Sequence, residues 1–439
     1  MPCQLPADCL NEIFEYLEED KPTLYSCLLV NRFWCKISIR ILWRDIWDRI
    51  AHHYEMGEVS IILGTLVACL PNESKELLFR NEIFIPTSTS NPPLFNYPAF
   101  CKVLSIDVIC RLIYKYFDQN NLQNKEYLVV NEVIKMFVNQ NSSLKRLTYY
   151  WTCDIDPNDI SFTCLSEAKV CLTDLSELNC TSSLPAEFFY QLSQICHNLQ
   201  SFTIDIEEEA SNDCSVSFVT LFLNLQEIKF LFLGGTKFEG FEKLQYVTFP
   251  KLQILNISYQ VPKPEYVMKF LENNGKNLKE FYIGENNGAL TLSITKFCPN
   301  LKKLFILFNN DELDILKAIF NSCQYLESIF FWCGKRFLGE NEVLETVAEY
   351  SPKNFCELKI YNDTVTELLP EELESFFISW ESRTPKKSLN LVIVKDLYDS
   401  LEVNEENMEI IKKYKNLALN LTAEFHEEIV TFLKILRRR

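Results

Sequence analysis

Residues 5–17 read Leu-Pro-Ala-Asp-Cys-Leu-Asn-Glu-Ile-Phe-Glu-Tyr-Leu, and they open the stretch, residues 1–50, around which the chain is organised. Pro6 suits the first turn of a helix, where its missing N–H has no partner to lose. Leu10, Phe14 and Leu17, with Ile13 beside them, recur at helical spacing and make one apolar stripe. Asp20-Lys21-Pro22 then ends the predicted helix.

Two further short apolar segments follow. Residues 24–30 form one, and Trp34, Ile37, Ile41 and Leu42 form the other at helical spacing. A set of helices this small leaves much apolar surface exposed when it stands alone. The sequence therefore predicts that another domain or a partner packs on it.

The order of residues in this stretch resembles an F-box. The family pattern is Leu-Pro, an acidic residue, Leu, Ile-Phe and Leu, followed by Val-x-Arg-x-Trp and a closing Leu-Trp. Asn31 stands where the family usually has Cys or Ser. The matching residues here are Leu5, Pro6, Asp8, Leu10, Ile13, Phe14, Leu17, Val30, Arg32, Trp34, Leu42 and Trp43.

The resemblance implies docking onto the Skp-family adaptor of an SCF (cullin–RING) ubiquitin ligase. It implies adaptor contacts at a set of residues, some of which must instead form the small domain's own core. The alternative is an N-terminal helical cap whose stripe packs on the following domain. The expected adaptor-binding residues are Leu5, Pro6, Leu10, Ile13, Phe14, Leu17, Val30, Trp34 and Leu42.

Further along, the chain repeats a Leu-x-x-Leu-x-Ile unit. Residues 300–306 read Asn-Leu-Lys-Lys-Leu-Phe-Ile, and close variants occupy residues 252–257 and 278–283. From Leu225 the steps to Leu252, Leu278, Leu301 and Leu326 are 27, 26, 23 and 25 residues. These steps fall in the range of leucine-rich repeats.

The segments between the repeats read as short helices. We expect helices at residues 188–196, 266–273, 290–297, 315–322 and 343–350. Cys196, Cys298 and Cys323 each precede a repeat Leu by three positions, which indicates a small buried residue at the corner between helix and strand.

This pattern resembles the helix-bearing leucine-rich-repeat proteins found behind F-boxes. The expected fold class is therefore α/β, with an N-terminal helical F-box and a solenoid that has parallel strands inside and helices outside. An unrelated α/β domain with evenly spaced elements is the alternative. The expected domains are residues 1–50, a helical connector with a Pro-rich linker at 51–100, and the solenoid at 101–439, capped by the N-terminal helices and closed by helices at 405–415 and 424–436.

The composition of the chain limits the kinds of partner and ligand that we expect it to bind. A formal net charge of -17 argues against nucleic acid, whose binding depends on neutralising phosphates. No apolar run is long enough to span a membrane. We expect no signal peptide, because the first residues lack a basic segment followed by an apolar run. The 17 cysteines occur singly and only four histidines are present, so we expect reduced thiols, no metal and no cofactor, in the cytoplasm or nucleus.

No motif of an enzyme stands out. The chain lacks phosphate-binding glycine loops and the usual hydrolase and protease signatures. Adjacent Cys196 and His197 allow a cysteine hydrolase as a minor alternative, although neighbours in sequence rarely face each other usefully. The expected catalytic set is therefore empty.

The side chain between the Leu and Ile of each repeat should point to the concave side of the solenoid. Aromatic residues occupy or adjoin this position on successive repeats: Tyr282, Phe305, Phe330 and Trp332. They predict an aromatic strip that binds a protein substrate. The alternative is that loops or the C-terminal tail cover these rings. Thr203, Lys229 and Asn256 hold the equivalent position in earlier repeats.

Together these features predict a substrate-recognition subunit of an SCF ubiquitin ligase that acts by holding a protein substrate rather than by chemistry. A leucine-rich-repeat scaffold that acts outside ubiquitin transfer is the competing interpretation.

Overall fold

The structure is a computed structural model of the chain. It divides into two compact units, Met1–Gln200 and Ser201–Arg439, which we describe separately. It describes residues 6–47, 50, 56–87, 93–120, 125–150, 168–206, 216–232, 240–257, 262–284, 287–362, 368–384, 388–394, 405–415 and 419–422.

The first unit begins with three short helices, α1 (Ala7–Glu15), α2 (Lys21–Cys27) and α3 (Arg32–Leu42). Side chains cap two of them. The Asp20 carboxylate accepts the Thr23 N–H at 3.2 Å at the start of α2, and Asn31 accepts the N–H groups of Phe33 and Trp34, both at 2.9 Å, at the start of α3. Asn31 is therefore a good N-cap in the position where the F-box pattern has Cys or Ser.

The rest of this unit alternates helices with parallel strands. Strands β1, β2 and β3 pair in sequence order, with Val103 opposite Arg146 and Arg146 opposite Glu177. The elements are α5 (Met56–Cys69), α6 (Asn72–Arg80), η1 (Tyr97–Phe100), β1 (Val103–Ser105), α7 (Ile106–Gln119), α8 (Glu126–Gln140), β2 (Arg146–Tyr149), α9 (Ala168–Leu172), β3 (Glu177–Thr181) and α10 (Ala186–Ile195).

The chain just after α3 contacts the start of β1. The backbone carbonyl of Arg44, just after α3, accepts the N–H groups of Lys102 and Val103 at 2.8 and 3.0 Å. These hydrogen bonds fit the expectation that the N-terminal segment caps the start of the repeats, because an exposed strand edge would leave such groups unpaired.

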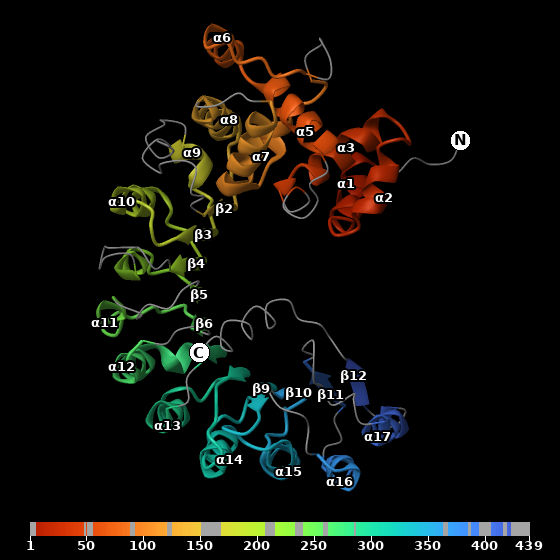
Figure 1. The fold of residues 1–439 in the computed structure, drawn as a ribbon, viewed down its shortest axis with the longest axis vertical. Helices are drawn as coiled ribbons and strands as arrows, with labels where there is room; N and C mark the ends of the chain where they lie inside the picture. Colours follow the sequence, from red (N-terminus) through yellow and green to blue (C-terminus); the bar gives the residue numbers. More distant parts are fainter. Residues whose placement is uncertain are drawn as a thin grey trace. The chain divides into compact units, whose positions relative to one another are not determined.

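In the second unit the strands also follow sequence order and are parallel, and helices α12 to α17 lie on their outer side (Figure 1). The elements are β4 (Ser201–Ile206), η3 (Val216–Leu221), β5 (Glu227–Phe232), α11 (Phe241–Leu244), β6 (Ile254–Ile257), α12 (Pro264–Asn274), η4 (Gly275–Asn277), β7 (Glu280–Ile283), α13 (Gly288–Phe297), β8 (Lys303–Phe305), α14 (Leu313–Ser322), β9 (Ser328–Cys333), α15 (Glu340–Tyr350), β10 (Glu357–Asn362), α16 (Pro370–Glu381), β11 (Leu389–Ile393), α17 (Glu405–Lys415) and β12 (Leu419–Thr422).

In strands β2, β6 and β7 burial alternates as the repeat predicts, whereas β9 is buried along its whole length. In the copy at 278–283, Leu278, Phe281 and Ile283 are buried, whereas Glu280 and Tyr282 are half-buried on the other face of the strand. We call the sheet face that carries Glu280 and Tyr282 the inner face. The predicted α/β class, a helical N-terminal domain followed by a leucine-rich-repeat solenoid, is confirmed by this arrangement.

The corner cysteines are buried, as the repeat pattern predicts. Cys196, Cys298 and Cys323 are the C-caps of α10, α13 and α14. The Cys323 thiol donates to the Cys298 carbonyl at 3.4 Å, which links two successive corners. All the cysteines that the structure describes are free thiols.

The predicted closing helix at 405–415 is present as α17. The second one, at 424–436, lies outside the described residues. The sequence did not suggest the helical segments η3 and α11, because these turns are too short to show a helical period.

Candidate functional site

Helices α1 to α3 share a small core of their own. Phe14, Leu24, Cys27, Ile37 and Ile41 form it. The rings of Phe14 and Trp34 meet edge to face with centroids 5.1 Å apart. Leu10, Leu17, Trp34 and Leu42 pack against this core while staying partly accessible.

A second set of apolar side chains on the same helices faces solvent. Leu29 is 89% exposed and Tyr16 is 87% exposed. We call the complete set the exposed apolar residues: Ile13, Tyr16, Tyr25, Leu29, Val30 and Phe33. Large exposed apolar side chains that gather on one small domain indicate an interaction surface.

The structure divides the predicted adaptor contacts into different environments. Pro6, Ile13 and Val30 are exposed and available to a partner, whereas Leu10, Leu17, Trp34 and Leu42 are half-buried. Phe14 requires a correction, because it is only 2% exposed and belongs to the core. Leu5 lies outside the described residues.

The sequence analysis did not identify Tyr16 and Leu29 as exposed apolar residues. Tyr16 lies three residues after Ile13 and therefore on the same side of α1, which is a signal that could have found it. Leu29 lies in the turn after α2, where a helical period gives no information about direction.

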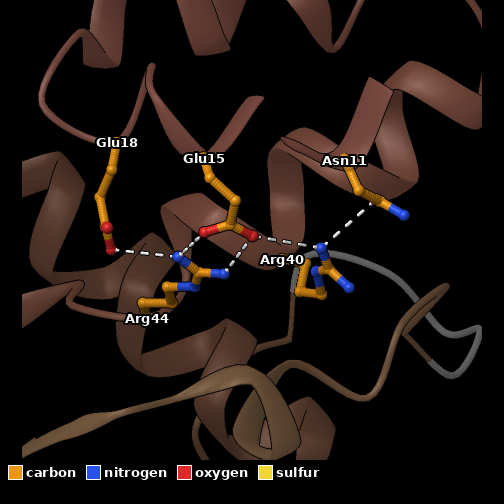
Figure 2. Close-up of polar contacts among 5 residues, drawn as sticks. All are labelled: Asn11, Glu15, Glu18, Arg40 and Arg44. Atoms are coloured by element: carbon orange, nitrogen blue, oxygen red, sulfur yellow. Dashed lines mark hydrogen bonds and ion pairs between the residues drawn. The ribbon is translucent and has the colours of Figure 1, made fainter. Parts of the chain in front are cut away.

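A polar clamp joins α1 to the end of α3 (Figure 2). The Arg44 guanidinium donates to both oxygens of Glu15, at 2.5 and 2.7 Å, and to Glu18 Oε1 at 3.4 Å. Arg40 reaches Glu15 at 3.5 Å and Asn11 at 3.4 Å. The hydrogen bond from Arg44 lowers the pKa of the Glu15 carboxyl and raises that of the Arg44 guanidinium.

The predicted aromatic strip lies on the inner face but is mostly covered. Phe305, Phe330 and Trp332 are 2, 8 and 6% exposed, and they form one cluster with Leu307, Tyr361 and Val394. The rings of Phe305 and Phe330 stack at 4.8 Å, and those of Trp332 and Tyr361 meet edge to face at 4.9 Å. The expectation of an open strip is therefore corrected for these three residues, and Tyr282 remains half-buried at its margin.

Acidic side chains on the inner face contact polar or charged side chains both along their own strand and on the neighbouring strand. The Glu280 carboxylate, for example, takes the Tyr282 hydroxyl at 2.9 Å and the Lys303 ammonium at 3.0 Å. Similar groups surround Glu227, which meets Ser201 and Lys229, and Glu357, which meets Ser328, Lys359 and Asn390. The contacts that join two strands, from Glu280 to Lys303, from Ser201 to Glu227, and from Glu357 to Ser328 and Asn390, support the register of those strands.

Cys196 does not suit a nucleophile. It is 3% exposed, and its thiol donates to the Leu172 carbonyl at 3.2 Å. Burial raises the pKa of this thiol to about 12, which opposes formation of the thiolate that nucleophilic chemistry needs. His197 is exposed. The geometry therefore gives no support to a cysteine hydrolase.

Within the described ranges, no three His, Cys, Asp or Glu side chains gather as metal ligands would. No helix in the part of the chain that the structure describes combines the length and apolar character of a membrane span.

Comparison with known proteins gives two findings. Residues 2–49 match the protein family described as F-box-like. A solved structure similar to this chain is the leucine-rich repeat-containing protein LegL7 from Legionella pneumophila, with 11% identity and a TM-score of 0.40 over 65% of this chain and 94% of that chain. A search of curated proteins gave no match.

Proposed function

We propose that this chain, which joins an F-box-like domain to a leucine-rich-repeat solenoid, is a substrate-recognition subunit of an SCF (cullin–RING) ubiquitin ligase. The observation that carries the proposal is the set of exposed apolar residues on α1 to α3, above all Leu29 and Tyr16. They lie on or directly beside helices that share a core without them, so folding of these helices does not account for their exposure.

The proposed mechanism is positional. The exposed apolar residues dock on a Skp-family adaptor, and the repeats hold a protein substrate near the subunit that carries ubiquitin. Holding two reactants in one complex raises their effective concentration without chemistry by this chain. The proposal assigns the chain to the cytoplasm or nucleus.

Adaptor binding is the first test. A Skp-family adaptor should copurify with the wild-type chain, and Leu29→Asp or Tyr16→Asp should weaken its binding by about tenfold or more, as loss of an interface anchor does. Because both side chains are exposed, neither change should alter the fold. Ile378→Asp is the matched control, since Ile378 is 56% exposed on α16 and lies outside the F-box-like residues.

A folded wild-type chain that ignores the adaptor would refute the proposal, as would variants that bind as tightly as wild type. Phe14 is unsuitable for this test, because a charge in the core would unfold the helices. Adaptor binding without recruitment of a cullin would instead favour the repeat scaffold that acts outside ubiquitin transfer.

We place substrate contact on the inner face, at Tyr282 and the polar residues of earlier repeats, Lys229 and Asn256, because the more apolar cluster beyond Tyr282 is covered. A photo-crosslinking residue at position 282 should capture proteins that also carry ubiquitin in a reconstituted ligase. The control position is Tyr325, which is exposed at the turn before β9. Equal capture of ubiquitin-bearing proteins at both positions would contradict this placement.

A further inference from the structure

Arg44, in the segment between α3 and β1, makes hydrogen bonds to the N-terminal helices and to the start of β1. The carbonyl of Arg44 accepts two N–H groups of the strand start, from Lys102 at 2.8 Å and Val103 at 3.0 Å. Lys102 does the same for the next strand, accepting Lys145 and Arg146 at 2.7 and 3.1 Å. Lys145 repeats the pattern with Ser176 and Glu177. Arg44 therefore occupies the position that the preceding repeat would occupy if the array continued toward the N-terminus.

The side chain of Arg44 points to the other partner. Its guanidinium makes the two-pronged contact with Glu15 near the end of α1 and a longer contact with Glu18 (Figure 2). A two-pronged pair between guanidinium and carboxylate fixes direction as well as distance. One residue thus ties α1 through its side chain and β1 through its backbone.

Residues next to Arg44 secure the same joint. Trp43 stacks on Tyr97 with ring centroids 4.4 Å apart, and Asp45 meets Arg146 of β2 at 3.6 Å. The indole N–H of Trp47 donates to the Val103 carbonyl at 2.6 Å. These contacts restrict the motion of residues 43–47. A restraint on the position of α1 therefore also restrains β1, because little flexible chain separates them.

We propose that Arg44 is a positioning residue that couples occupancy of the α1–α3 surface to the stability of the first repeat strand. The inference rests on the proposed function for the identity of the partner at that surface. A partner that fixes α1 also fixes Glu15 and, through Arg44, the carbonyl that holds the edge of β1. The adaptor would then set the direction in which the repeats begin.

Hydrogen exchange of the full chain, with and without a Skp-family adaptor, tests this coupling. In wild type, the adaptor should slow exchange of the Lys102 and Val103 amides by about fivefold or more, the lower range for coupled sites. Arg44→Met keeps the backbone carbonyl and the apolar stem but loses the clamp. It should bind the adaptor as wild type does, yet lose most of this slowing. Glu15→Gln should behave like Arg44→Met, because it cuts the same contact from α1.

Arg40→Met is the matched control. Arg40 also reaches Glu15, at 3.5 Å, but its carbonyl does not hold β1. It should keep the slowing that Arg44→Met loses. A purely structural role for Arg44 would speed exchange equally with and without the adaptor and leave the adaptor effect unchanged, which would overturn the proposal. Equal slowing in all variants would overturn it too.

Failure of the proposed function gives a different result. If the wild-type chain does not bind the adaptor, that function is refuted. The coupling is then tested by hydrogen exchange of the chain alone in increasing concentrations of denaturant. Amides of α1 and β1 should then open at one midpoint in wild type and at two midpoints in Arg44→Met. Two midpoints in wild type would refute the coupling itself.

Discussion

Ile13 and Phe14 are adjacent in the sequence and in the F-box pattern, but they do different work. Phe14 is buried against Trp34, whereas Ile13 is 46% exposed. The turn of about 100° between successive helical residues separates them, since only one can point at Leu24 and Ile37. A pattern that names both as contacts cannot say which one builds the domain and which one faces a partner.

Truncating these two residues should therefore have unequal effects on stability. Phe14→Ala should lower the free energy of unfolding of the N-terminal helices by about 3–5 kcal/mol, because it leaves a cavity in a small core. Ile13→Ala should change it by less than about 0.5 kcal/mol. Urea denaturation followed by circular dichroism measures both, and equal losses would contradict the burial.

The clamp between Glu15 and Arg44 should make stability depend on pH. Arg44 lowers the folded-state pKa of Glu15, so the pair stabilises the fold above the unfolded pKa of about 4.3 and loses that effect as pH falls through the folded value. After allowance for solvent screening of a carboxylate that is 37% exposed, Glu15→Gln should cost about 1 kcal/mol at neutral pH.

Urea denaturation of wild type and Glu15→Gln across the acid range measures this dependence. The difference in free energy of unfolding should shrink toward zero in acid. Glu18→Gln is the control and should show a smaller difference throughout, because Glu18 lies 3.4 Å from Arg44. A difference of constant size at every pH would exclude the pair as its source.

Elements were the part of the structure that the sequence predicted best. Leu225, Leu252, Leu278, Leu301 and Leu326 each precede a strand at the expected place, because a side chain buried between strand and helix has to recur once per repeat. The spacing could not show that Phe305 and Trp332 are covered. They share a buried cluster with Tyr361 and Val394 from later repeats, which no local pattern relates to them.

The contact between η4 and the end of α13 depends on a glycine. A Cβ at position 275 would lie 2.8 Å from both Cys298 Sγ and the Phe297 carbonyl oxygen, which is backbone and cannot step aside. Gly275→Ala should therefore destabilise the second unit by about 1–3 kcal/mol.

Gly339→Ala is the matched control in the same unit. There the nearest atom to an added Cβ is Glu342 Oε2 at 3.4 Å, an ordinary contact. Gly339 is the N-cap of α15, where Ala is somewhat less favourable than Gly, so this change should cost less than about 1 kcal/mol. Thermal unfolding of the two variants beside wild type compares them, and equal melting temperatures for wild type and Gly275→Ala would contradict the close approach of the two segments.

At the scale of the whole molecule, the reactivity of the cysteine thiols depends on whether the chain is folded. Nine of the described cysteines are buried: Cys27, Cys101, Cys110, Cys171, Cys180, Cys196, Cys298, Cys323 and Cys333. Burial raises the pKa of Cys101, Cys196 and Cys323 to about 12, so these thiols are shielded as well as protonated at neutral pH.

Of the 17 thiols in the chain, at least nine should therefore resist a thiol-reactive dye in the native state and react after denaturation. Peptide mapping should find Cys9 among those that react early, because it is exposed on α1. Rapid native labelling at Cys196 that His197→Ala abolishes would instead revive the cysteine hydrolase.

The pairing of each strand with the strands next to it in sequence has a consequence for synthesis on the ribosome. A new strand pairs with the edge of the strand before it, which has already left the exit tunnel of the ribosome. For β1, the carbonyl of Arg44 provides this edge before any repeat has been translated. Contacts between sequence neighbours form quickly because little chain has to be closed into a loop. The first repeats can therefore assemble in the order in which they are made, with the N-terminal helices as their template.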